Sequence, residues 1–180
     1  MKKSLEESRL KTRRFKKALT WVIGISVTGG IIAIVVWLSI QPESKRPGEA
    51  FGNQGQQHIA IGATHTAYNS NPPTSGPHYA QPANWGIYQN ELSDENLVHN
   101  LEHGGIWISY TGISTTTIEQ IEALAKKYSN KMIVTPRSGN DSPIVLASWT
   151  RLQKLEQFDE TTIVNFIKAN KNRSPEPNAQ

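Results

Sequence analysis

The sequence predicts an α+β fold, with one N-terminal transmembrane helix followed by one small exported domain. Three observations support this prediction. Residues 21–40 contain no charged side chain, and about 20 apolar residues are enough to cross a membrane. Residues 106–167 alternate strand-like and helix-like hydrophobic patterns in the order β-α-β-β-α, which predicts a mixed sheet. Residues 58–97 are rich in His, Pro and Asn without periodicity, which predicts an irregular half of the domain.

The predicted transmembrane helix spans residues 20–40. We expect the basic segment 1–19 to stay in the cytoplasm, because cytoplasmic flanks carry the excess of Lys and Arg. A cleaved signal peptide and a buried core helix are the alternatives. A signal peptide has a shorter apolar region of about 7–15 residues and an Ala-x-Ala-like site, which is missing after residue 40. The sequence therefore predicts a single-pass protein of the cell membrane whose C-terminal domain is extracytoplasmic.

The distribution of charge argues against nucleic acid as a partner. The net charge is +4, but residues 1–19 hold eight basic and two acidic side chains, and the rest of the chain holds 11 basic and 13 acidic ones. The basic excess therefore belongs to the membrane flank and not to the domain, which lacks the basic patch of a nucleic-acid interface. Cysteine is absent, which excludes thiolate catalysis and cysteine-based zinc sites.

The rest of the chain divides into three parts by composition. Residues 41–57 are rich in Pro, Gly and Gln and predict a flexible stalk. Residues 58–170 are expected to form the exported globular domain, which is long enough to bury a modest core. Residues 171–180 are polar, contain two prolines and predict a disordered tail.

The regular elements of the domain lie in its second half. We expect strands at Ile106–Tyr110, Lys131–Thr135 and Ile144–Trp149. We expect one helix that begins within Ser114–Thr117 and a last helix that begins within Asp159–Thr162. The first two strands should be parallel, because a helix connects them. The second and third strands are separated only by a turn cluster, so we expect them to pair as a hairpin.

All the histidines of the chain fall between residues 58 and 103, and histidine is the commonest metal ligand. His99 and His103 are four residues apart and would share one face of a helical turn. His78 ends a loop that three prolines make stiff. With His65 as a fourth ligand, these side chains predict a site for a zinc or copper ion. His58 lies at the boundary of the predicted stalk and is not included in this set.

Glu102 is the candidate catalytic residue, because it follows His99 by three residues and lies close to the same helix face. It could be a general base on a metal-bound water, a metal ligand, or a partner that orients an imidazole. The order His99-x-x-Glu102-His103 matches that of inverzincin proteases. A peptidase is disfavoured, because Gly104-Gly105 ends any helix at this point. A purely structural network of these polar side chains is a further alternative.

Two strings in this region point to a known family: Pro-Pro-Thr-Ser-Gly-Pro-His over residues 72–78 and Val-His-Asn-Leu-Glu-His-Gly over residues 98–104. Together with Tyr68, Trp85 and Tyr88, they resemble the bacterial membrane-anchored proteins grouped as domain of unknown function 3105. The resemblance covers roughly residues 48–170. It implies an exported domain on an N-terminal anchor, and it implies no reaction.

Three functions are compatible with these observations. The favoured one is a metal-binding module at the outer face of the membrane, which handles zinc or copper. Copper(I) transport is disfavoured, because the only methionines are Met1 and Met132. The second is a metal-dependent hydrolase with Glu102 as base. The third is a binding or assembly module with structural histidines, whose partner is an envelope protein or a small molecule. The sequence leaves the oligomeric state open.

Overall fold

The computed structural model describes residues 46–128 and 130–179, together with Lys16, Gly24, Ser26 and residues 28–34. The chain divides into two units, Met1–Lys45 and Arg46–Gln180. Most of the predicted cytoplasmic segment 1–19 and of the predicted transmembrane helix 20–40 lies outside the described residues. Within the described part of the chain, no helix has the length and apolar character needed to span a membrane.

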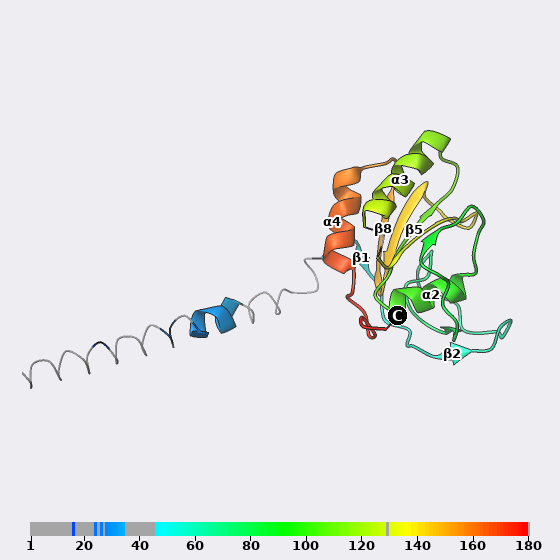
Figure 1. The fold of residues 1–180 in the computed structure, drawn as a ribbon. Helices are drawn as coiled ribbons and strands as arrows, with labels where there is room; N and C mark the ends of the chain where they lie inside the picture. The colour runs from blue at the N-terminus through cyan, green and yellow to red at the C-terminus, as the bar shows by residue number, and fades with distance from the viewer. Residues whose placement is uncertain are drawn as a thin grey trace, which may run out of the picture. The chain divides into compact units, whose positions relative to one another are not determined.

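The second unit has the predicted α+β fold with a mixed sheet. Its elements are β1 (Glu49–Ala50), β2 (His58–Ile59), β3 (His78–Tyr79), β4 (Gly86–Ile87), α2 (Asp94–Glu102), β5 (Ile106–Tyr110), α3 (Thr115–Lys127), β6 (Met132–Pro136), β7 (Ile144–Ser148), β8 (Arg151–Leu155) and α4 (Glu160–Asn170). Six strands form one sheet in the order β1-β8-β7-β5-β6-β4, and β2 pairs with β3 in a separate two-stranded sheet (Figure 1).

The helices α3 and α4 begin where a polar side chain precedes an amphipathic run. The Ser114 side chain accepts a hydrogen bond from the backbone N–H of Thr117, and Asp159 accepts one from Thr162, as is usual for helix N-caps. Both helices bury their apolar faces in one core with side chains of the central strands. This core includes Ile106, Ile108, Ile121, Leu124, Ile144, Leu146, Ile163 and Phe166.

Strand β5 shows why the sheet has a core on each face. Successive side chains of a strand point to opposite faces, so Ile106 and Ile108 join the core with α3 and α4, whereas Trp107 joins a second core. The second core contains Leu97, Val98 and Leu101 of α2, together with Ile133, Ala147 and Trp149. Helix α2 and the irregular segment therefore cover the face opposite to α3 and α4 (Figure 1).

The strand order confirms one predicted pairing and corrects another. Strands β5 and β6 are parallel, as expected across α3. The predicted hairpin of β6 and β7 is wrong, because β7 pairs with the other edge of β5 and forms its hairpin with β8. The connection from β6 to β7 passes the end of β5, where the Arg137 N–H donates to the Tyr110 carbonyl and the Thr111 N–H donates to the Pro143 carbonyl.

The compact unit begins earlier than predicted. Strand β1 lies inside the predicted stalk and pairs antiparallel with β8 at the edge of the sheet. Further along, the backbone N–H of His78 donates to the Gln57 carbonyl at 2.9 Å. The prediction of a flexible stalk is therefore wrong for residues 46–57. Its composition is that of a linker, but its backbone groups find hydrogen-bond partners on the domain.

The predicted disordered tail is also part of the compact unit over its described residues. The Glu176 N–H donates to the Glu102 carbonyl at the end of α2. The Lys131 ammonium donates to the carbonyls of Pro177 and Ala179, each within 2.9 Å. The described part of the tail therefore packs against the C-terminal end of α2. Its polar composition conceals these contacts, because they are made largely by the backbone.

Candidate metal centre

Helix α2 brings three of the candidate side chains together. Ser93 caps its N-terminus, and its last residue is Glu102, with His103 as the C-cap. One helical turn separates His99 from His103, and their Nε2 atoms are 3.0 Å apart. This confirms the prediction that His99 and His103 share one helix face. The turn also brings the Glu102 carboxylate close to the same face, as its spacing from His99 predicted.

The Pro-rich loop before β3 holds His78 at a fixed place. Every residue from Pro72 to His78 is buried. The Tyr68 hydroxyl donates to the Pro77 carbonyl at 2.6 Å, which holds the loop against the domain. Gly76 has a φ of +121°, and a Cβ there would lie 3.1 Å from the Tyr68 ring, so the close approach requires glycine. The loop therefore leaves the His78 side chain little freedom.

His58, which the sequence analysis left out, lies beside His78. Strands β2 and β3 are parallel, with His58 and His78 as register partners. The His58 ring also stacks on that of His99, with ring centroids 4.9 Å apart and an interplanar angle of 14°. Its place in the histidine-rich window was a signal for this role. The assignment of the preceding residues to a stalk concealed it.

Four side chains from three segments meet at one point: His58, His78, His99 and Glu102. Each offers one ligand atom, and these atoms all lie within 4.8 Å of one another. His78 Nε2 is 2.9 Å from Glu102 Oε2, and His58 Nε2 is 3.8 Å from the same oxygen. The side chains of His78 and Glu102 are 0% and 3% exposed, and that of His58 is 50% exposed. This cluster could hold a metal ion.

Backbone carbonyls determine which ring nitrogen faces the cluster. The Nδ1 atom of His78 lies 2.7 Å from the Gly76 carbonyl, and that of His99 lies 2.7 Å from the Tyr79 carbonyl. A carbonyl can only accept, so in both rings Nδ1 carries the proton and donates it. In a neutral ring, Nε2 is then an unprotonated acceptor. Histidines that bind metals usually have this arrangement, with the far nitrogen donating to a carbonyl or carboxylate.

The contact between His78 and Glu102 has an electrostatic consequence. Burial lowers the pKa of His78, although the Gly76 hydrogen bond and the Glu102 charge act in the opposite direction. His78 Nε2 lies at hydrogen-bond distance, 2.9 Å, from a carboxylate oxygen of Glu102. The other oxygen of this carboxylate accepts a hydrogen bond from Gln56 Nε2 at 2.6 Å. The 2.9 Å contact is a hydrogen bond only with a proton between the two atoms, and a metal ion could take the place of that proton.

The other two predicted ligands lie elsewhere or at the edge of the cluster. His65 is not among the clustered residues, and its Nε2 lies 3.4 Å from Glu95 Oε1. His103 contacts the cluster only from its side, through the 3.0 Å approach to His99 Nε2, and its Nε2 is 3.7 Å from Glu176 Oε2. The spacing in the sequence could not separate His65 from the others, because it lies on an irregular loop.

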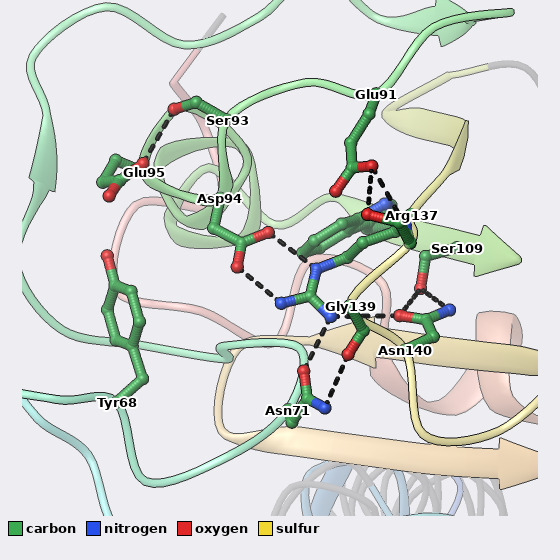
Figure 2. A network of polar contacts seen from close by, with 12 residues as sticks. Tyr68, Asn71, Glu91, Ser93, Asp94, Glu95, Ser109, Arg137, Gly139 and Asn140 are labelled. Atoms are coloured by element: carbon green, nitrogen blue, oxygen red, sulfur yellow. Dashed lines mark hydrogen bonds and ion pairs between the residues drawn. The ribbon is translucent and has the colours of Figure 1, made fainter. Parts of the chain in front are cut away.

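A network around Arg137 ties together the two segments that carry most of the cluster. Arg137 Nε and Nη2 donate to the two carboxylate oxygens of Asp94, and Nη1 donates to Asn71 Oδ1 at 2.6 Å (Figure 2). Asp94 is the first residue of α2, and Asn71 precedes the Pro-rich loop. The guanidinium group also lies 5.9 Å from the centroid of the Trp107 ring. This side chain therefore fixes α2 and the loop relative to the end of β6.

A sequence model of the family described as protein of unknown function DUF3105 matches residues 60–180. The chain belongs to this family. The family match includes His78, His99 and Glu102, and it begins just after His58. Neither the curated proteins nor the solved structures include a match to the chain. Membership confirms the resemblance drawn from the two sequence strings, and the membrane anchor that the resemblance implied stays a prediction.

Proposed function

We propose that this domain binds one transition-metal ion through His58, His78, His99 and Glu102. The observation that carries the proposal is the convergence of four ligand atoms within 4.8 Å of one another, three of them on buried side chains. His78 Nε2 and Glu102 Oε2 lie 2.9 Å apart and need a cation between them, and a metal ion could replace the proton of this hydrogen bond. The carbonyl bonds of the His78 and His99 rings support the same interpretation.

The ligand atoms favour zinc or copper(II). Three imidazole nitrogens and one carboxylate oxygen suit zinc, and imidazole also suits copper. With zinc–nitrogen bonds of about 2.0–2.1 Å, neighbouring ligand atoms of a tetrahedral site lie about 3.4 Å apart. The separations of 2.9 Å and 3.8 Å from Glu102 Oε2 bracket this value. Copper(I) is disfavoured, because the chain has no cysteine and Met132 is buried in the core with α3.

We further propose that the domain is extracytoplasmic and held at the cell membrane by residues 20–40. The support is in the sequence: a charge-free run over residues 21–40 that follows a basic segment. The bound metal would then come from the medium or from an envelope component. Metal handling at the cell surface follows from combining this location with the cluster.

The geometry favours Glu102 as a ligand over Glu102 as a general base. A general base needs a carboxylate oxygen free to accept a proton from a bound water. Here Oε2 faces the ring nitrogens of His58 and His78, and Oε1 accepts from Gln56. A metal-dependent hydrolase is therefore the less favoured function.

Metal analysis of the purified protein tests the proposal. The full-length chain, in detergent and without a His tag or chelator, would be incubated with zinc or copper(II), desalted and measured by mass spectrometry. We expect close to one equivalent of metal, lost in the His78→Ala/His99→Ala variant and kept in the control His65→Ala. Circular dichroism would verify that the variants are folded. A folded wild-type protein that takes up neither metal at micromolar concentration would refute the proposal and leave a structural network of histidines.

A further inference from the structure

Three of the four ligands are fixed by the fold, and one is not. His78 and His99 are held by their Nδ1 hydrogen bonds to backbone carbonyls, and Glu102 is held by Gln56. All three side chains are buried. Each would therefore keep its position if the metal ion left. The three ligands come from α2 and from the Pro-rich loop, which the Arg137 network ties to the six-stranded sheet.

His58 differs from them in exposure and in its contacts. Half of its side-chain surface is exposed. Its contacts within the described part of the chain are the 3.8 Å approach to Glu102 and ring contacts with His99 and His78, and no hydrogen bond fixes its ring. It is carried by β2, which has two residues and lies outside the six-stranded sheet. The ring can therefore rotate away into solvent without breaking a hydrogen bond.

We propose that His58 is the ligand through which the metal ion is exchanged, so that the site transfers metal and does not hold it permanently. This inference rests on the proposed function. The exposed side of the site is the side of His58, so an incoming nitrogen, oxygen or sulfur donor approaches there. The bond from the metal to the His58 nitrogen breaks, a bond to the incoming donor forms, and the oxidation state of the metal does not change. His78, His99 and Glu102 retain the ion until further donors replace them.

His58 leaves the metal first because the free-energy cost of releasing a ligand depends on the protein contacts that the side chain must also break. Withdrawal of His78 would break its bond to Gly76 and expose part of a buried loop. Withdrawal of His58 loses only ring contacts and leaves a half-exposed side chain more exposed. The loss of one ligand from a binding site changes mainly the rate at which the bound ion dissociates.

Zinc transfer to a chromogenic chelator, pyridylazoresorcinol, tests the inference on the full-length protein in detergent. The protein would be loaded with one equivalent of zinc and mixed with the chelator in a stopped-flow instrument. For the wild type, we expect the release rate to rise with chelator concentration. For His58→Ala, we expect one zinc still to bind, but to be released about tenfold faster or more, since weaker sites differ mainly in dissociation rate. His65→Ala serves as the matched control and should behave as the wild type.

The possible failures are distinguishable. If the wild type binds neither zinc nor copper(II), the proposed function fails and the inference fails with it; if it binds copper(II) alone, the release experiment is run with copper(II). If the wild type binds zinc but His58→Ala loses it as completely as His78→Ala, or releases it at the wild-type rate, the exchange role of His58 is wrong and the metal site stands. A wild-type release rate that does not depend on chelator concentration overturns the inference without any variant. His58→Gln, which keeps a polar side chain, provides a second test if His58→Ala is poorly folded.

Discussion

The substitution Glu102→Gln should make the metal-free domain more stable while it weakens metal binding. In the metal-free protein, the 2.9 Å hydrogen bond between His78 Nε2 and Glu102 Oε2 needs a proton, and burial lowers the pKa of His78. A glutamine has nearly the same size, and its amide nitrogen could donate a hydrogen bond to His78 Nε2. Its oxygen would still accept from Gln56 Nε2, which now lies 2.6 Å from the carboxylate. The variant would thus make this hydrogen bond without taking up a proton.

The size of the effect follows from the cost of an unsatisfied buried group. A hydrogen bond contributes about 1 kcal/mol net, and an unsatisfied buried acceptor costs about 1–3 kcal/mol. We therefore expect the free energy of unfolding of the metal-free variant to rise by about 1–3 kcal/mol. For a domain of this size, that corresponds to an increase in Tm of about 3–10 °C. Metal affinity should fall by at least about tenfold, because a neutral amide replaces a charged ligand.

Thermal unfolding followed by circular dichroism would measure both effects, first with a chelator and then with a saturating concentration of zinc. The wild type should gain stability from zinc, and Glu102→Gln should gain much less. Glu102→Ala is the control that removes the carboxylate and leaves Gln56 without this acceptor, and it should lose stability in both conditions. If Glu102→Gln is less stable than the wild type without metal, a proton already bridges His78 and Glu102 and the reasoning is refuted.

Three further predictions concern the structure around the site. Arg137→Lys should lower the free energy of unfolding by about 2 kcal/mol in urea titrations, because lysine cannot make the bidentate hydrogen bonds to Asp94. A decrease in unfolding free energy that is smaller than the measurement error would contradict this. Gly105→Ala should destabilise the domain by about 2 kcal/mol more than Gly139→Ala. The added Cβ at position 105 would lie 2.6 Å from a ring carbon of Trp85, whereas the nearest atom at position 139 would be 3.4 Å away. Equal melting temperatures of the two variants would show that the Trp85 ring moves aside. The metal-free domain should lose stability as the pH falls from about 7 to 5, because burial holds the pKa of His78 below its unfolded value and the unfolded chain takes up the proton first. Urea titrations at several pH values measure this slope, and His78→Gln should have a shallower one.

The local parts of the fold were predictable because their signals are contained in short stretches of chain. The amphipathic pattern and polar caps of α3 and α4 identify both helices, and β5 and β6 must be parallel when α3 connects them. The position of β7 beside β5 was not predictable in this way. A short connection usually means a hairpin, and the hydrogen bonds that route this one past the end of β5 involve residues far apart in the sequence.

The extent of the domain was harder to predict than its elements. Strands β1 and β8 carry little hydrophobic pattern, since β1 has two residues and β8 has apolar side chains only at Leu152 and Leu155. Each is stabilised by its neighbour in the sheet and not by its own composition. The same is true of the tail, whose hydrogen bonds join it to the end of α2. Composition alone therefore assigned structured segments to a stalk and a tail.

The sequence by itself determined the chemistry that is available and part of its arrangement. It excludes cysteine chemistry, places all histidines in one window, and sets His99, Glu102 and His103 at the end of one short helix through their spacing. Only the tertiary structure decided which histidines meet. The pairing of β2 with β3 brings His58 to the cluster, and an irregular loop takes His65 to Glu95. The reason is that helical spacing fixes distances within a turn, whereas the meeting of distant segments depends on packing and backbone hydrogen bonds that no local pattern records.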